Sequence, residues 1–202
     1  PKPSENGENS EEFIKTLKEV HKLGKIVLSS WNPKSSAVLA FGEQDSRAKI
    51  VLYNEEKYSI AETYELKHPF AMSSSTGRTT NEVTCLSWSP SGNEIVTGVE
   101  NGELRLWNLE GKLQNVFNFH RCPIVSIKWN EDATHFLSAD VDNVTILWNA
   151  VTGTALQYFE FKENGSSSDS LGVDLEWVEK DKFVIPGPQG SIIVYQMGEN
   201  KP

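Results

Sequence analysis

The chain has 202 residues, 38% of them hydrophobic and 23% charged, and its formal net charge is −9 at pH 7. This acidic balance argues against binding to the phosphate backbone of nucleic acids, which needs clustered Lys and Arg. No apolar run is long enough to cross a membrane, and we expect residues 1–11 to be a disordered segment rather than a signal or transit peptide. The two cysteines, Cys85 and Cys122, imply no disulfide framework and indicate a reducing compartment.

Short alternating segments separated by polar turns predict strands along most of residues 12–202. Residues 13–20 fit either a helical turn or a strand, and residues 26–66 form the first four-stranded unit. The stretch 68–81, rich in Ser, Thr and Gly, then predicts a surface loop. Further units follow at 82–119, 124–161 and 172–197.

The clearest unit is VSIKWNEDATHFLSADVDNVTILWN, residues 125–149, which predicts three antiparallel strands. Moving it upstream by 41 residues places Trp129 on Trp88 and Trp148 on Trp107. Looser copies surround the two remaining tryptophans, so all six occupy only two positions of the unit. A period of about 40–45 residues with four strands and a fixed aromatic is typical of a WD-repeat β-propeller, whereas a β-sandwich has no reason to repeat it. We therefore predict an all-β propeller with four consecutive blades.

The predicted blades do not complete a ring. The fourth unit has no outer-strand signal, and four blades would leave open sheet edges of the kind that natural folds avoid. We therefore expect residues 12–202 to be a partial propeller, half of an eight-bladed one. Because propeller chains often begin with the outer strand of the final blade, we favour a ring-closing strand at residues 13–20.

Polar residues recur at fixed places in the units. In the third unit His120 precedes the first strand, Ser138 ends the second, Asp142 lies in the next turn and Trp148 closes the third. Similarity to WD repeats implies a structural hydrogen-bond chain through these four side chains, with the Asp142 carboxylate orienting the imidazole. A weaker set in the second unit is His68, Thr97, Asn101 and Trp107. The first unit has His21 and Asp45, with Val51 or Tyr53 in place of Trp, and the last unit lacks both His and Asp.

Several runs carry a more specific resemblance. HRCPIVSIKWN, HFLSADVDNVTILWNAVTG and EVTCLSWSPSGNEIVTGVENGELRLWN resemble the transducin-beta-like corepressor proteins, which are WD-repeat subunits of histone deacetylase complexes built as eight-bladed propellers. The resemblance is strongest to fungal members, the WD-repeat subunits of the Set-three deacetylase complex, and covers about residues 26–197. Phe119 replaces the Gly of the family's Gly-His pair, and Asn108 and Asn149 replace the Asp of its Trp-Asp pair.

The resemblance implies a nuclear, non-enzymatic scaffold that acts in transcriptional repression. Its partners would be corepressor and deacetylase subunits, with histone tails as a further partner class. In such propellers, partners dock on the loops around the mouth of the central channel. These loops are expected at 70–81, 121–123 and 162–171, together with 43–46, 99–101, 140–142 and 187–189. Charged residues there that packing does not need are the candidate partner contacts: Glu43, Arg78, Glu100, Arg121 and Asp140.

The alternative is a propeller hydrolase with an active site at the channel mouth, because Ser, His and Asp also form hydrolase triads. No G-x-S-x-G elbow surrounds Ser138, and the repeat already accounts for His21, His68 and His120, leaving only His135. His120 and Cys122 lack a second Cys/His pair that would complete a zinc site, and no Gly-rich phosphate loop occurs. We therefore predict no catalytic residue, no metal, no cofactor and no direct nucleic-acid or membrane binding.

Overall fold

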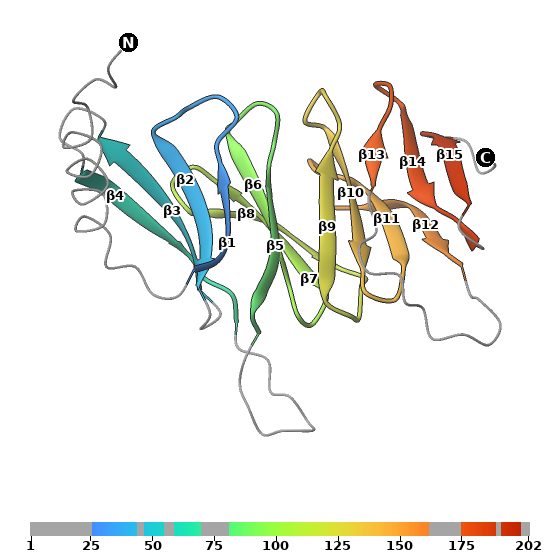
Figure 1. Cartoon of the computed structure of the whole chain (residues 1–202), viewed down its shortest axis with the longest axis horizontal. Coiled ribbons are helices and arrows are strands. Elements are labelled where there is room, and N and C mark those ends of the chain that lie inside the picture. Colours follow the sequence, from blue (N-terminus) through green and yellow to red (C-terminus); the bar gives the residue numbers. More distant parts are fainter. Residues whose placement is uncertain are drawn as a thin grey trace, which may run out of the picture.

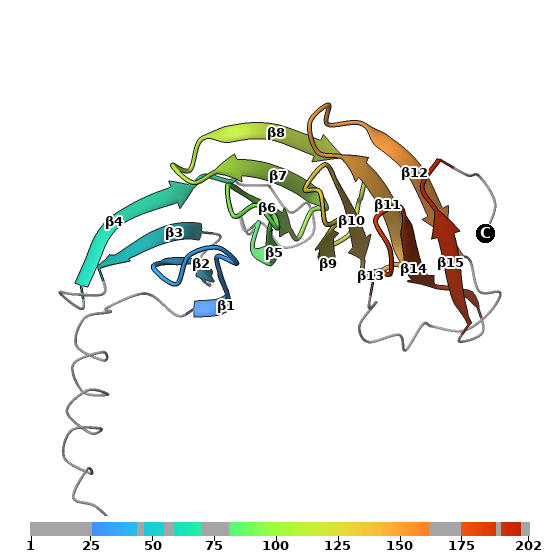
Figure 2. The same cartoon turned by 90° about the horizontal axis from the view of Figure 1, so that it is seen from above.

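The computed structural model describes residues 26–43, 47–54, 59–69, 81–161, 175–188 and 191–198. Within these ranges every regular element is a β-strand, and the strands form four antiparallel sheets (Figure 1). Seen from above, the sheets follow one another along an arc, with the first strand of each sheet on the concave side (Figure 2). The predicted all-β, partial-propeller fold is confirmed, whereas the expectations for residues 1–11 and 13–20 lie outside the described residues.

Each sheet is a simple meander, and we call the sheets blades 1 to 4. Blade 1 contains β1 (Ile26–Trp31), β2 (Val38–Glu43), β3 (Arg47–Asn54) and β4 (Ser59–Leu66). Blade 2 contains β5 (Val83–Trp88), β6 (Glu94–Val99), β7 (Glu103–Asn108) and β8 (Leu113–Asn118). Blade 3 contains β9 (Ile124–Trp129), β10 (His135–Asp140), β11 (Val144–Asn149) and β12 (Ala155–Glu160). Blade 4 has three described strands, β13 (Glu176–Trp177), β14 (Lys182–Pro186) and β15 (Ile192–Gln196).

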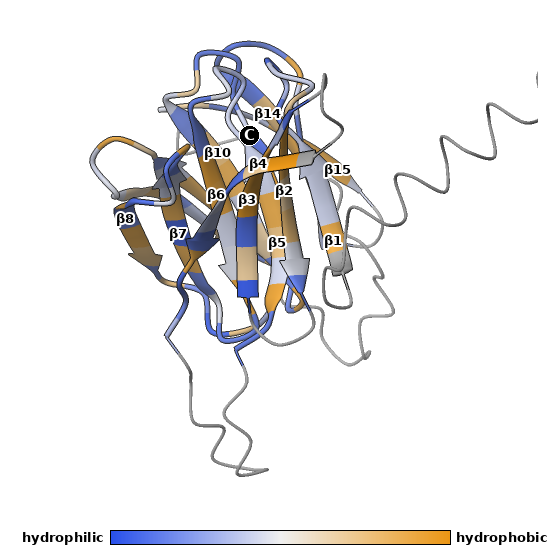
Figure 3. Cartoon of the chain, turned by 90° about the vertical axis from the view of Figure 1, so that its left-hand side faces the viewer, coloured by the Kyte–Doolittle hydropathy of each residue, from blue (hydrophilic) through white to orange (hydrophobic). Residues whose placement is uncertain are grey.

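Polar turns join the strands, and their side chains satisfy the main chain. The Asn130 amide oxygen accepts the main-chain N–H groups of Thr134 and His135, which closes the turn between β9 and β10. Asn149 does the same for Val151 and Thr152 after β11. Asn side chains favour such turns because they replace a main-chain acceptor locally. Hydrophobic residues are concentrated on the strands, and many of the connecting loops are hydrophilic (Figure 3).

The hydrophobic core lies between blades. Successive side chains of a strand point to opposite faces, so a sheet with a neighbour on each side buries both sets. In β10, Phe136 packs with blade 2 residues, whereas Leu137 packs with blade 4 residues. This double burial explains why consecutive residues are apolar in both strands, Phe136 and Leu137 in β10 and Ile146 and Leu147 in β11. Gly98 allows a close approach of two blades, because a Cβ at this position would lie 2.6 Å from the Cβ of Ile124 in the next blade.

The first-strand tryptophans link the blades by hydrogen bonds, a feature the sequence did not reveal. The Trp88 indole donates to the Ser30 carbonyl at 3.0 Å, and the Trp129 indole donates to the Ser87 carbonyl at 3.1 Å. The Trp177 indole donates to the Lys128 carbonyl at 3.0 Å. Each acceptor belongs to the residue before the first-strand tryptophan of the preceding blade. The same donor–acceptor pair therefore recurs at all three contacts between blades.

Candidate functional site

A buried polar chain fixes blade 3. His120, in the connection from β8 to β9, places Nδ1 2.8 Å from the Asp140 carboxylate and Nε2 2.6 Å from the Ser138 hydroxyl. The Trp148 indole donates to the same Ser138 oxygen at 2.8 Å. A carboxylate only accepts, so Nδ1 donates to Asp140, and a neutral imidazole then accepts the Ser138 proton at Nε2. Every polar group is satisfied, and the connection into β9 is tied to β10 and β11.

The acid of this chain is Asp140, so the prediction of Asp142 was wrong. Ser138 and Asp140 are two residues apart in β10 and share one face of the sheet, where the imidazole lies. Asp142 is further into the turn and is exposed, and its carboxylate accepts a hydrogen bond from the Cys122 thiol at 2.9 Å. That hydrogen bond, followed by burial, raises the pKa of Cys122 to about 11.

The same geometry argues against the hydrolase alternative. Ser138 is completely buried, and its hydroxyl oxygen already receives the indole N–H. A nucleophile must reach its substrate, and its base must be free to take the proton during reaction. The side chains resemble a triad in composition, but they are arranged to hold strands together.

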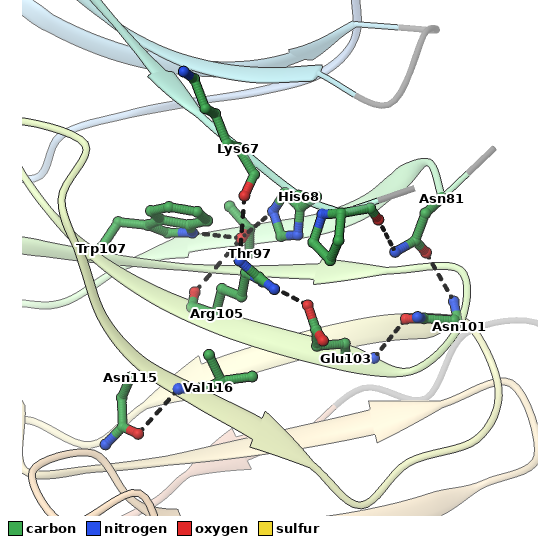
Figure 4. A network of polar contacts seen from close by, with 11 residues as sticks. Lys67, His68, Asn81, Thr97, Asn101, Glu103, Arg105, Trp107, Asn115 and Val116 are labelled. Carbon is green, nitrogen blue, oxygen red and sulfur yellow. Dashed lines mark hydrogen bonds and ion pairs between the residues drawn. The ribbon is translucent and has the colours of Figure 1, made fainter. Parts of the chain in front are cut away.

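Blade 2 has an incomplete version of this chain (Figure 4). His68 Nε2 lies 2.8 Å from the Thr97 hydroxyl, which also accepts the Trp107 indole N–H at 2.8 Å. Asn101 was predicted to replace the acid, but its amide oxygen accepts the Glu103 N–H instead, which corrects that assignment. The position equivalent to Asp140 is Val99, because both follow the central hydroxyl residue of the chain by two residues.

His68 therefore has one unsatisfied nitrogen. Its Nδ1 is buried and has no hydrogen-bond partner among the described residues. Burial, with a smaller contribution from the Arg105 charge, lowers the pKa of His68 to about 3. The imidazole is consequently neutral at physiological pH, and blade 2 lacks the imidazole–carboxylate contact that orders blade 3.

The strand register shows which residues of blades 1 and 4 occupy the third-strand position that Trp107 and Trp148 hold in blades 2 and 3. Trp107 and Trp148 lie opposite Ile95 and Phe136. In blade 1 the corresponding partner of Leu39 is Val51 and not Tyr53. In blade 4 the corresponding residue is Tyr195, opposite Phe183. His21 and Asp45, expected to complete blade 1, lie outside the described residues.

The loops expected at the channel mouth do lie together in blades 2 and 3. The Glu100 N–H donates to the Glu82 carbonyl at 3.0 Å, and the Val141 N–H donates to the Pro123 carbonyl at 3.0 Å. Each bond joins the segment leading into a first strand to the turn between the second and third strands of the same blade. We call residues 99–101, 121–123 and 140–142 the channel-mouth face.

The five candidate contacts have different environments. Arg121 is exposed on the channel-mouth face, and Glu100 is half-buried, with its carboxylate accepting the Glu82 N–H. Two candidates were chosen as charges that packing does not need, and that reasoning was wrong for both. Glu43 is buried and pairs with Lys49 at 2.9 Å, while Asp140 is buried in the polar chain.

Arg78 lies outside the described residues. Asp142 and Val141 are exposed on the face and were not among the predicted partner contacts.

Among the described residues, no group of three or more His, Cys, Asp or Glu side chains could hold a metal ion. In the same part of the chain, no helix is long and apolar enough to span a membrane.

Radially placed antiparallel meanders with first-strand tryptophans and a His–Ser–Trp chain define a WD-repeat β-propeller protein. A family model described as "Anaphase-promoting complex subunit 4 WD40 domain" matches residues 31–132. The chain belongs to this WD40 family.

Sequence comparison with individual proteins places the chain more specifically within this family. The chain is 57% identical to the SIR4-interacting protein SIF2 of Saccharomyces cerevisiae, over 94% of this chain and 38% of that protein. It is 31% identical to human F-box-like/WD repeat-containing protein TBL1X, over 88% of this chain and 30% of that protein. The chain thus spans about a third of the length of these curated relatives. The predicted resemblance to transducin-beta-like proteins and their fungal members is confirmed.

Solved structures agree with the fold. The crystal structure of the C-terminal WD40 domain of Sif2 matches with a TM-score of 0.80 and 56% sequence identity, over 91% of this chain and 49% of that chain. The computationally designed Ika4 protein matches with a TM-score of 0.60 at 18% identity, which shows the fold alone. Four blades therefore correspond to half of the Sif2 domain.

Proposed function

We propose that the chain is part of a non-enzymatic interaction scaffold in a nuclear histone deacetylase corepressor complex that represses transcription. The observation that carries the proposal is the channel-mouth face, whose loops are joined in pairs by main-chain hydrogen bonds and supported by the buried His120 chain. A rigid face loses little conformational entropy when a partner binds. The relatives support this role, since one is named as a protein that interacts with SIR4.

The partners would be corepressor and deacetylase subunits. Arg121 provides an exposed cation on the channel-mouth face, which also carries the exposed Asp142 and Val141. Mixed charges around an apolar residue are typical of the polar rim and hydrophobic centre of protein interfaces. The net charge of −9 also favours basic partners, and histone tails are the second class that we include.

Affinity capture from nuclear extract tests this function, with the 202-residue chain as bait and co-purifying histone deacetylase activity as readout. We expect Arg121→Glu to lower the recovered activity about tenfold, since reversing one interfacial charge costs about 1.4 kcal/mol or more. The matched control is Lys112→Glu, because Lys112 is an exposed cation in the β7–β8 turn, at the opposite end of the strands. Equal recovery with wild type and Arg121→Glu would show that the face does not bind the complex.

A further inference from the structure

Two aromatic side chains are exposed on the outer side of blade 3. Phe119, which directly follows β8, is 60% exposed, and Tyr158 in β12 is 50% exposed. Leu156, two residues before Tyr158 in the same strand, is exposed as well. Blade 3 packs against blade 2 on one face and blade 4 on the other, so this exposure is not an effect of the ends of the arc. Grouped exposed apolar side chains of this kind mark contact surfaces for other molecules.

The strand register brings the two aromatic residues to one surface. Tyr158 lies opposite Ile146, and Trp148, two residues further along β11, lies opposite Ala155. The Ile146 and Trp148 side chains both pack with blade 2 residues, so they share one face of blade 3. The Phe119 ring packs edge-on against Trp148, with the ring centroids 6.3 Å apart and the ring planes at 72°. Phe119 and Tyr158 therefore both adjoin the outer end of this face.

Blade 2 has no aromatic residue at either of the corresponding positions. Phe119 precedes the histidine of the polar chain in blade 3, and Lys67 precedes it in blade 2. Tyr158 follows Ser138 in the cross-strand row of blade 3, whereas Val116 holds that place in blade 2. The architecture of a blade therefore does not require these two exposed rings.

The charge of the outer side determines which partner fits it. The outer strands β4, β8 and β12 lie along the convex side of the arc (Figure 2), and they contain no Lys or Arg. Their charged residues are three carboxylates, Glu62, Glu65 and Glu160, all of them exposed. The Tyr158 hydroxyl donates to the Glu160 carboxylate at 3.2 Å, which places a negative charge beside a half-exposed ring. The Tyr64 hydroxyl donates to Glu62 in the same way, so β4 repeats the pair.

We propose that Phe119, Leu156, Tyr158 and Glu160, which we call the outer patch, bind a Lys- or Arg-rich segment of a partner protein. The face of an aromatic ring attracts a cationic side chain, and the Glu160 carboxylate adds an opposite charge next to it. Phe119 and Leu156 cover the aliphatic part of a long Lys or Arg side chain. The net charge of −9 attracts the same segment at longer range. This surface goes beyond the proposed function, because it does not require the channel-mouth face to bind a deacetylase complex.

Arg121 lies where the outer patch meets the channel-mouth face. The pKa of the Tyr158 hydroxyl is raised by partial burial, by the hydrogen bond to Glu160 and by the charges of Glu160 and Asp140, and the Arg121 charge opposes this rise. Arg121 is thus close enough to Tyr158 for its charge to act there, and it repels a basic segment from this end of the patch. The same residue therefore has opposite effects on the two proposed surfaces.

Fluorescence anisotropy of a labelled peptide tests the outer patch on the purified 202-residue chain. The probe is a short synthetic peptide of alternating Lys and Ser, and a Glu–Ser peptide of the same length is the charge control. We expect the Lys–Ser peptide to bind, more weakly as salt is added, and the Glu–Ser peptide not to bind. Phe119→Ala and Tyr158→Ala should each raise the Kd about threefold, and Glu160→Lys about fivefold.

Two variants control for folding and for net charge. Tyr158→Phe keeps the ring and should bind the Lys–Ser peptide almost as well as wild type. Glu131→Lys changes the net charge as Glu160→Lys does, but Glu131 is exposed in the β9–β10 turn, at the opposite end of the strands from Arg121. It should therefore weaken binding much less than Glu160→Lys.

Arg121→Glu distinguishes the outer patch from the proposed function. We expect this variant to bind the Lys–Ser peptide about threefold more tightly, although it captures less deacetylase activity. Capture equal to wild type, with peptide binding still weakened by Tyr158→Ala, would refute the proposed function and support the outer patch. No binding of the Lys–Ser peptide, equal binding by wild type and Tyr158→Ala, or equal losses in Glu131→Lys and Glu160→Lys would each overturn the outer patch.

Discussion

Replacing Asp140 with Ala should destabilise the protein by about 3–5 kcal/mol, whereas Asp142→Ala should cost no more than about 0.5 kcal/mol. One Asp140 oxygen accepts a hydrogen bond from His120 Nδ1. The other accepts hydrogen bonds from the main-chain N–H groups of Asp142 and Val144. Removing the carboxylate leaves a buried imidazole nitrogen and two turn N–H groups without their acceptor. The Asp142 side chain, by contrast, is exposed, and among the described residues its carboxylate accepts a hydrogen bond only from the Cys122 thiol.

Urea unfolding followed by tryptophan fluorescence measures this difference, with all proteins at one concentration because association would add to stability. Asp142→Ala is the matched control, since it removes the same group two residues away. Asp140→Asn should fall between the two, because the amide retains one acceptor oxygen for the turn. If Asp142→Ala proved the more damaging change, the assignment of the acid to Asp140 would be wrong.

Trp129→Ala should cost about 3–5 kcal/mol, and Trp129→Phe only about 1–2 kcal/mol. Trp129 is buried between blades 2 and 3, lies 5.2 Å from Phe136 between ring centroids, and donates to the Ser87 carbonyl. The alanine variant loses the ring and the hydrogen bond, while the phenylalanine variant loses chiefly the hydrogen bond. The two variants thus measure packing and the indole donor separately.

The same urea titrations provide the readout, and Phe119→Ala is the control because Phe119 is an aromatic residue that is mostly exposed. Its truncation should change stability by no more than about 1 kcal/mol. A Trp129→Phe variant as unstable as Trp129→Ala would mean that the indole hydrogen bond, and not ring packing, dominates the contact between blades. If Trp129→Ala, Trp129→Phe and Phe119→Ala were all equally stable, Trp129 would not contribute to the packing of blade 3 on blade 2.

Much of the fold was predictable because its signals are local and periodic. Strand alternation, polar turns and the constant offset of Trp88 and Trp129 identified the blades and their order. The acceptors of the tryptophan indoles could not be found this way, because they lie in the neighbouring blade and belong to main-chain carbonyls of any residue type. Those acceptors depend on how blades pack and not on the sequence of one blade.

The candidate site was harder to predict for a different reason. Asp140 and Asp142 both follow Ser138 closely, and only the two-residue period of β10 places Asp140 beside the imidazole. Glu43 was chosen as a loop charge, but its pairing with Lys49 depends on the β2–β3 register. Loop position alone therefore did not separate charges used for packing from charges available to partners. Of the candidates that lie among the described residues, Arg121 is the exposed one.

Hydrogen–deuterium exchange of the chain, with and without a purified deacetylase–corepressor assembly, tests the central claim most directly. The scaffold account predicts slower exchange at residues 99–101, 121–123 and 140–142 when the assembly is bound. It predicts unchanged exchange in the outer strands β8 and β12. Protection confined to β8 and β12, or binding without protection at the channel-mouth face, would contradict the account.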